Sequence, residues 1–301
     1  MQGFDVEVEQ KSESTLNDKV MYYSLKAFLS LTAIMPKSLV YGFMKTLTLS
    51  FYTLSKRRRE ITQDNIQKSF PKLSTLEVET LSKEVFIELS KTISEILLLI
   101  TERFDIDDAI ENREEALVKL KNLRDAHPEG WVFMTAHFSN WELGAHFLAK
   151  YGYAALAIGR EGDNKMIDQK IVTPFRQKYG NGSIYKKNAA IAVFKALKRG
   201  EIVGILLDQK VNDKEGIKVT FFDRDVYTTS LVATMKKNLD ITVVPVFLPR
   251  MPNGKYTLLV GEPIENNSNI KEMTQSYNDS IEKIVREYPS QWFWMHNRWK
   301  V

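Results

Sequence analysis

Apolar and polar positions along the chain follow two alternating patterns. Short apolar runs rich in β-formers predict buried strands at 131–136, 154–158, 202–207, 241–248 and 255–260. Segments with helical spacing predict helices at 141–150, 165–179, 188–199, 228–238 and 270–287. Strands that alternate with helices are typical of an α/β fold, in which a mostly parallel central sheet is flanked by helices. We therefore expect such a sheet in this chain.

Two more helices are expected before the first strand. Residues 74–101 carry apolar side chains at helical spacing and follow Pro71, which indicates a long amphipathic helix. Residues 111–125 predict a second, more polar helix. Together with the alternating segments they make residues 57–301 the expected α/β domain.

The first 56 residues have a different character. Residues 1–20 are polar and predict a mobile tail, whereas 21–56 is apolar and aromatic. Pro36 and lysines such as Lys26 and Lys45 interrupt this second segment, so its uncharged pieces fall short of the roughly 18 residues that a spanning helix needs. Two short helices that associate with the membrane surface are the expectation.

A basic cluster at 56–59 follows the apolar segment directly. Anionic lipid attracts such a cluster by about 1 kcal/mol per charge near the surface. The alternative is a pair of helices buried in a soluble core, with the basic cluster exposed on a turn. Both interpretations predict helices on either side of Pro36.

Overall composition narrows the possible chemistry. The 301 residues suffice for one large domain or two small ones. Lys and Arg total 42 against 38 Asp and Glu, an excess too mild to indicate a nucleic-acid partner. The absence of cysteine excludes disulfides, thiolate catalysis and Cys-ligated metals.

The most informative stretch is 137–142, where the first predicted strand ends and a helix begins. His137 is expected at the carboxyl end of that strand, where open α/β sheets bind their ligands. Glu142 follows five positions later, and the two side chains can meet only if the chain turns between them. A histidine beside a carboxylate predicts a general base with a partner that orients it.

The residues of this stretch also fit two roles other than acid–base catalysis, namely a helix cap and a metal site. Ser139 and Glu142 have the spacing of a capping box, which would account for Glu142 without catalysis. His137, Glu142 and His146 could instead bind a metal, although the usual zinc spacing is missing. If it binds no metal, His146 is expected to pack in the interior.

Two further polar residues follow predicted strands. Arg160 and Asp208 come directly after apolar runs, so parallel strands would place them with His137 on one rim of the sheet. Arg160 could bind a phosphate, because its guanidinium presents a fork of donors. The alternatives are a surface arginine and an aspartate that caps a turn.

Several motifs follow one another in a fixed order along the chain. They are His137-x4-Glu142, Arg57-Arg58-x4-Thr62-x2-Asn65, Phe70-Pro71, Arg160, Asp208-Gln209, Phe221-Phe222, Thr228-Thr229 and the terminal Trp294-x-His296-x-Arg298-Trp299-Lys300. With this set the chain resembles the lipid A biosynthesis acyltransferases, the late lauroyl and myristoyl acyltransferases of Gram-negative bacteria. The resemblance covers nearly all of the chain after residue 20. Its His-x4-acid element is shared with glycerolipid acyltransferases.

The resemblance implies an O-acyltransferase of lipid A and lipopolysaccharide biosynthesis at the cytoplasmic face of the inner membrane. Acyl carrier protein would donate the fatty acyl chain, and a hydroxyl of a lipid A precursor would accept it, with no cofactor or metal. His137 and Glu142 would be catalytic, while Arg160, Asp208, Asn140 and Arg298 would bind substrate. Two alternatives stay open: the acceptor is another membrane glycolipid or an amino-acid-containing lipid, or the chain is a non-catalytic peripheral lipid-binding protein.

Overall fold

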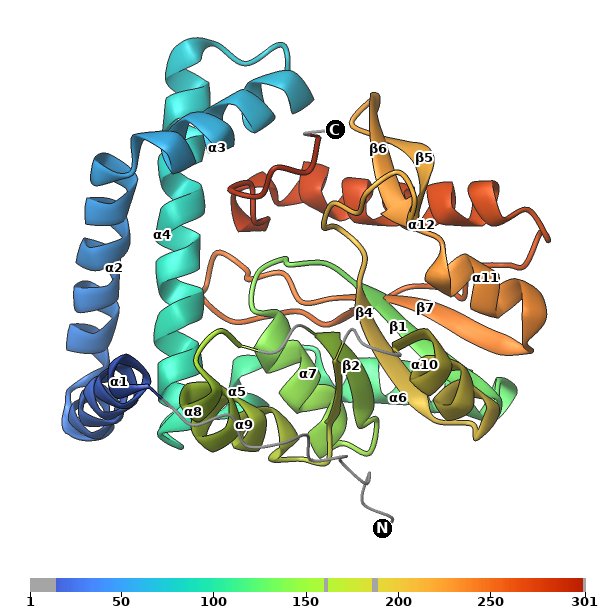
Figure 1. Ribbon diagram of the computed structural model, residues 1–301, viewed down its shortest axis with the longest axis horizontal. Coiled ribbons are helices and arrows are strands. Elements are labelled where there is room, and N and C mark those ends of the chain that lie inside the picture. The colour runs from blue at the N-terminus through green and yellow to red at the C-terminus, as the bar shows by residue number, and fades with distance from the viewer. Residues whose placement is uncertain (1–14, 160–161, 186–188, 300–301) are drawn as a thin grey trace.

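The protein was analysed as a computed structural model that describes residues 15–159, 162–185 and 189–299 (Figure 1). The described chain begins with four long helices, namely α1 Leu16–Ile34, α2 Lys37–Leu54, α3 Lys56–Ser69 and α4 Thr75–Ile100. Pro36 separates α1 from α2, as predicted. The predicted tail at 1–20 is too long, because Thr15 caps α1 in a capping box with Asp18. The part of that prediction at 1–14 lies outside the described residues.

The second helix runs beside the long fourth helix (Figure 1). Val40 and Met44 of α2 pack with Leu97 and Leu98 of α4 in a small cluster of their own. Arg103 fixes the turn between α1 and α2, because its Nη1 donates to the carbonyl oxygens at 32 and 35. One side of α2 is therefore part of the folded body, while the apolar side chains on its other side are exposed.

Six strands form the central sheet, in the order β3-β2-β4-β1-β7-β8. Their bounds are β1 Gly130–Thr135, β2 Ala155–Gly159, β3 Gly182–Tyr185, β4 Ile202–Leu206, β7 Ile241–Phe247 and β8 Leu259–Val260. The strands pair in parallel except for β8, which is antiparallel to β7. The predicted α/β fold with a mostly parallel sheet is confirmed, although the strand expected at 255–260 is only two residues long.

Helices cover both faces of the sheet. Along β1, Val132 and Met134 join one buried cluster, whereas Trp131 and Phe133 join the other, as successive side chains of a strand must. The remaining helical segments are α5 Ile106–Ala109, α6 Arg113–Ala126, α7 Trp141–Lys150, α8 Lys165–Ile167, a π-helical turn Asp168–Val172, α9 Thr173–Gln177, α10 Ala189–Lys198, α11 Leu231–Asn238, α12 Ile270–Glu287 and a 3₁₀ turn Pro289–Gln291.

A separate hairpin packs against α12 (Figure 1). Strands β5 Gly216–Phe221 and β6 Arg224–Thr229 are antiparallel, and the helix predicted from 228 begins only at Leu231. The two turn residues, Phe222 and Asp223, both have positive φ. No helix within the described ranges is both long and apolar enough to cross a bilayer.

Candidate active site at the carboxyl edge of the sheet

The ends of two adjacent strands bring His137 and Asp208 together. Strands β1 and β4 pair up to Thr135 and Leu206, and each polar residue lies two positions beyond its strand. The backbone N–H of His137 donates to Asp208 Oδ2 at 2.9 Å, and Nδ1 lies 2.9 Å from Oδ1. The prediction that these two residues share one rim of the sheet is confirmed. Arg160, the third residue of that prediction, lies outside the described residues.

The Asp208 carboxylate is almost completely buried and has a third donor. The indole Nε1 of Trp292 donates to Oδ2 at 2.9 Å. Burial raises the pKa of this carboxyl, but the nearby imidazole and the hydrogen bonds from His137 and Trp292 outweigh that effect and hold the pKa below its usual value. Asp208 therefore stays ionised and accepts the Nδ1 proton, which leaves the His137 Nε2 lone pair facing outward.

Glu142 does not contact the imidazole, so the prediction that it orients His137 is wrong. Its carboxylate accepts hydrogen bonds from Arg176, with Nη2 2.5 Å and Nε 3.1 Å from Oε1. Glu142 lies in the first turn of α7, and its side chain therefore reaches α9 instead of the end of β1. The carboxylate partner of His137 comes from a residue 71 positions away.

The turn between strand and helix is built differently from a capping box. Asn140, and not Ser139, caps α7, because its Oδ1 accepts from the Leu143 N–H at 3.0 Å. Ser139 has a φ of 52°, and its buried hydroxyl has no hydrogen-bond partner. The positive φ makes the sharp reversal that separates His137 from the helix.

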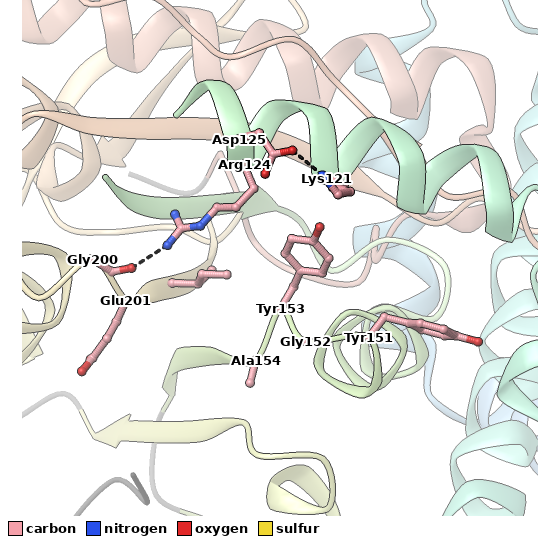
Figure 2. Close-up of a pocket in the computed structure, with 10 residues that line it drawn as sticks. Lys121, Arg124, Asp125, Tyr151, Gly152, Tyr153, Ala154, Gly200 and Glu201 are labelled. Atoms are coloured by element: carbon pink, nitrogen blue, oxygen red, sulfur yellow. Dashed lines mark hydrogen bonds and ion pairs between the residues drawn. The ribbon is translucent and has the colours of Figure 1, made fainter. Parts of the chain in front are cut away.

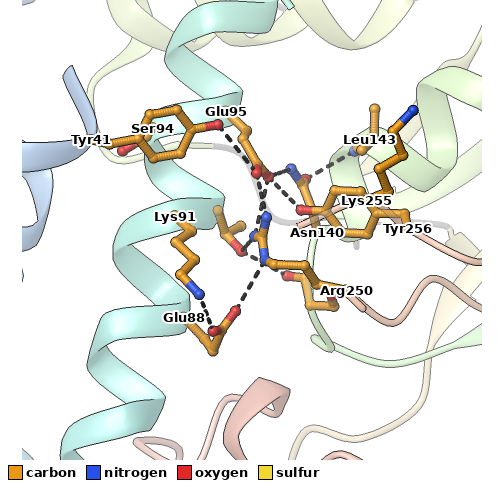
Figure 3. A network of polar contacts seen from close by, with 12 residues as sticks. Tyr41, Glu88, Lys91, Ser94, Glu95, Asn140, Leu143, Arg250, Lys255 and Tyr256 are labelled. Carbon is orange, nitrogen blue, oxygen red and sulfur yellow. Dashed lines mark hydrogen bonds and ion pairs between the residues drawn. The ribbon is translucent and has the colours of Figure 1, made fainter. Parts of the chain in front are cut away.

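A buried polar network holds this turn in place (Figure 3). The Asn140 amide donates to Glu95 Oε2 at 2.9 Å, and Arg250 Nη2 donates to the same oxygen at 3.1 Å. The Tyr256 hydroxyl also donates to Glu95, and Tyr41 of α2 lies 3.4 Å from Oε1. Asn140 is fully buried with both ends of its amide bonded, so it supports the site without an exposed surface for substrate.

Arg298 is equally enclosed. Its Nη1 donates to the carbonyl oxygens of Gln209 at 2.8 Å and Tyr227 at 2.9 Å, and its Nη2 donates to Thr228 Oγ1 at 2.5 Å. Burial lowers the pKa of Arg298 to about 10. Arg298 therefore connects the chain after Asp208 to the β5–β6 hairpin. Both Arg298 and Asp208 are buried, so neither offers a surface for direct substrate contact.

The segment that contains the 3₁₀ turn completes the site. Its backbone pairs with the loop after β1: the Ser139 N–H donates to the Gln291 carbonyl at 2.6 Å and the Phe293 N–H to that of His137 at 3.1 Å. Phe293 and Trp141 lie beside the imidazole ring. Sequence reasoning missed Trp292, although its place in a terminal aromatic run was visible.

His146 belongs to the interior. Its two ring nitrogens lie 2.7 Å and 2.9 Å from the carbonyl oxygens of Glu142 and Phe175, which disfavours a ligand role. Among the residues that the structure describes, no group of three potential ligands is arranged to hold a metal ion.

Two cavities lie at opposite ends of the strands. The one beside His137 is about 20 Å³ and lies between α4 and the segment 290–295. The other, about 460 Å³, lies at the amino ends of β2 and β4 between Tyr153, Arg124 and Glu201 (Figure 2). Charged groups in the larger cavity are paired: Lys121 with Asp125, Arg124 with the carbonyl oxygens of Glu129 and Gly200, and Glu201 with Arg199.

In this α/β protein an imidazole lies at the carboxyl edge of a parallel sheet, and a buried carboxylate holds its Nδ1. A site of this kind can activate a hydroxyl. The sequence profile of the bacterial lipid A biosynthesis acyltransferases matches residues 9–301, and the chain belongs to this family. The resemblance found in the sequence is thereby confirmed.

Curated relatives agree with this assignment. The chain is 26% identical to the lipid A biosynthesis lauroyltransferase of Escherichia coli K12, over 82% of this chain and 80% of that protein. It is 24% identical to the palmitoleoyltransferase of the same strain over the same shares. A lipid A biosynthesis acyltransferase of Haemophilus influenzae is 22% identical over 89% of this chain and 84% of that protein.

Proposed function

We propose that this protein transfers a fatty acyl chain from acyl carrier protein to a hydroxyl of a lipid A precursor, with His137 as general base. The observation that supports this most is the geometry of the imidazole: Nδ1 is engaged by buried Asp208, and the His137 side chain is partly exposed. Membership of a lipid A acyltransferase family supports the reaction class. No cofactor enters the proposed reaction.

The proposed step needs one proton acceptor and one oxyanion site. His137 Nε2 takes the proton of the acceptor hydroxyl as its oxygen bonds to the thioester carbon. The carbon–sulfur bond then breaks, and the imidazolium returns the proton to the departing thiolate. Asp208 stabilises the transient imidazolium, as the carboxylate of a catalytic triad does. The amino end of α7 favours negative charge and is proposed to stabilise the oxyanion.

Glu142 receives a different part in this proposal. Through its ion pair with Arg176 it holds α9 against α7, the helix that follows the loop of His137, without touching the imidazole. Arg160 comes directly after β2 in the sequence, and we keep it as the proposed phosphate-binding residue for the acceptor or for the phosphopantetheine arm of the carrier.

The acyl chain requires a groove that opens. Apolar side chains that suit a hydrocarbon line part of the cavity beside His137, namely Val85, Leu89, Phe293 and Met295, while polar residues such as Glu88 and Gln291 line the rest. Its volume of about 20 Å³ corresponds to about one water molecule. We therefore propose that side chains that line it, such as Leu89 and Met295, move apart when the acyl chain binds, while the backbone of 290–295 keeps its hydrogen bonds to the loop of His137.

The exposed apolar surface of the first two helices supports an interfacial location, which we propose is the cytoplasmic face of the inner membrane. On α2, Leu39, Phe43 and Leu47 lie one helical turn apart and are 58%, 50% and 51% exposed. The exposed Lys56 and Arg57 follow at the start of α3. An apolar face next to basic residues is typical of helices that lie on anionic membranes.

A transfer assay tests the reaction. Acyl transfer from acyl carrier protein to a lipid A precursor is measured for the wild type and His137→Ala, with His127→Ala as the matched control. We expect His137→Ala to lose about 10²–10⁴-fold of the rate and the control to keep it. A wild-type protein that binds lipid and transfers nothing would support the non-catalytic alternative.

Lipid mass spectrometry of a deletion strain tests the acceptor. Lipid A that lacks one acyl chain is the expected result. If lipid A is unchanged and another glycolipid or an amino-acid lipid is altered, that other lipid is the acceptor.

Membrane association is tested on the apolar face alone. Leu39, Phe43 and Leu47 are changed to serine, which leaves the Val40 and Met44 contacts with α4 intact. We expect this variant to bind anionic vesicles at least tenfold more weakly than wild type, whereas the control Leu76→Ser, exposed on α4, binds unchanged. Equal binding of both variants would exclude α2 as the membrane contact.

A further inference from the structure

Gln209 occupies the one position at which a substrate must meet the base. Its side-chain nitrogen lies 3.1 Å from Nε2 of His137. Because Asp208 engages Nδ1, the neutral imidazole carries its free lone pair on Nε2. The donor end of the Gln209 amide is the end that fits a lone pair, so the amide donates its hydrogen bond to the base.

The backbone of this glutamine is fixed, but its side chain is exposed. Arg298 Nη1 donates to the Gln209 carbonyl at 2.8 Å, and the preceding residue is the buried Asp208. The side chain itself lies on the protein surface. Rotation about its side-chain bonds can therefore remove the amide from Nε2 without any change in the backbone around the site.

A hydroxyl that gives its proton to Nε2 must come within about 2.6–3.2 Å of that atom. The Gln209 amide already lies at such a distance, so it and the acceptor hydroxyl exclude one another. After it turns aside, the amide remains next to the reacting centre, where a neutral N–H donor can stabilise the negative oxygen of the tetrahedral intermediate. Side-chain amides of asparagine and glutamine serve as donors of this kind.

We propose that Gln209 caps the base in the substrate-free protein and becomes a donor to the oxyanion when the acceptor hydroxyl displaces it. This inference rests on the proposed function, because it needs His137 as the base of acyl transfer. The amide gives up no proton in either state, so the proton balance of the transfer step is unchanged. Its two consequences are a shielded His137 before substrate binds and a faster chemical step afterwards.

The test variant is Gln209→Met, which keeps the length of the side chain and removes the donor. Lys210→Met, at the next exposed position, is the matched control. The first measurement is the rate at which diethyl pyrocarbonate modifies His137 in substrate-free protein, followed by peptide mass spectrometry. We expect this rate to rise severalfold in Gln209→Met and to stay at the wild-type value in the control.

The second measurement is the transfer reaction. We expect Gln209→Met to lower kcat about 10²–10³-fold, the effect of losing one oxyanion donor, with KM within about threefold of wild type. An unchanged modification rate or an unchanged kcat overturns the inference. His137→Ala in the same assay separates the two proposals: full activity there removes the proposed function, whereas its loss beside a normal Gln209→Met removes only the role of Gln209.

Discussion

The two ends of the central sheet differ in a way that cavity size does not reveal. At the amino ends of the strands lies the larger space, about 460 Å³, but its charged side chains are satisfied by neighbouring partners. At the carboxyl ends the cavity is only about 20 Å³, yet a buried carboxylate holds one nitrogen of an imidazole there, and the exposed, rotatable side chain of Gln209 contacts the other. The orientation of the polar side chains therefore identifies this site better than the volume of the cavity does.

The largest effect should come from removing the carboxylate that orients the base. Asp208→Asn keeps the shape of the side chain but favours the wrong tautomer of His137, and we expect acyl transfer to fall by on the order of 10³-fold. Glu142→Gln, which touches Arg176 instead, should cost about tenfold or less. Steady-state rates of both variants check this order, and a larger loss in Glu142→Gln would restore Glu142 as the partner of the base.

A smaller effect is expected for the network behind the carboxyl edge. Glu95→Ala leaves Arg250 buried without its main partner, so the free energy of unfolding should fall by about 3–5 kcal/mol. Urea denaturation measures this loss, and Glu88→Ala, whose carboxylate is more exposed, serves as the control with a smaller loss. Equal losses would mean that the network does not depend on Glu95.

The acid dependence of stability provides a third test at the same edge. The pKa of Asp208 is lower in the folded protein than its usual 3.8, so its ionised form contributes stability above that value. This contribution is lost as the pH falls through the lower, folded-state pKa. The difference in unfolding free energy between wild type and Asp208→Asn should therefore be constant near neutrality and shrink below about pH 4. A difference that stays constant at acid pH would contradict it.

The smallest effect is expected at the amino ends of the strands. Lys121→Ala removes an exposed ion pair with Asp125, so we expect stability to stay close to that of wild type and acyl transfer to be unchanged. Thermal unfolding and the transfer assay check both. A tenfold loss of transfer would show that the larger cavity takes part in the reaction and would reverse the comparison of the two edges.

Local patterns of the sequence predicted most of the elements. The break at Pro36 and the apolar runs that became β1, β4 and β7 were all visible, because each is determined by neighbouring residues. The β5–β6 hairpin was not, since its turn has positive φ at Phe222 and Asp223, where Asn-Gly is the recognisable signal. Helix α3 was also missed, because its basic residues favoured a turn.

The partner of the base could not be predicted, for a topological reason. Glu142 is close to His137 along the chain, but the helix that begins at Trp141 turns its side chain toward Arg176. Asp208 is close only because β4 inserts next to β1, and chain order does not reveal that neighbour relation. Both strand ends were recognised in the sequence, whereas the direction of their side chains depends on how the sheet is assembled.

The hydrogen bond from Trp292 to Asp208 links the completion of the carboxyl edge to the progress of synthesis. The indole is made 84 residues after the carboxylate that it contacts, and its backbone neighbours also clamp the loop of His137. A nascent chain that has folded β1 and β4 thus holds a base whose carboxylate lacks its third donor. The complete set of hydrogen bonds at Asp208 can therefore form only after Trp292 has been synthesised.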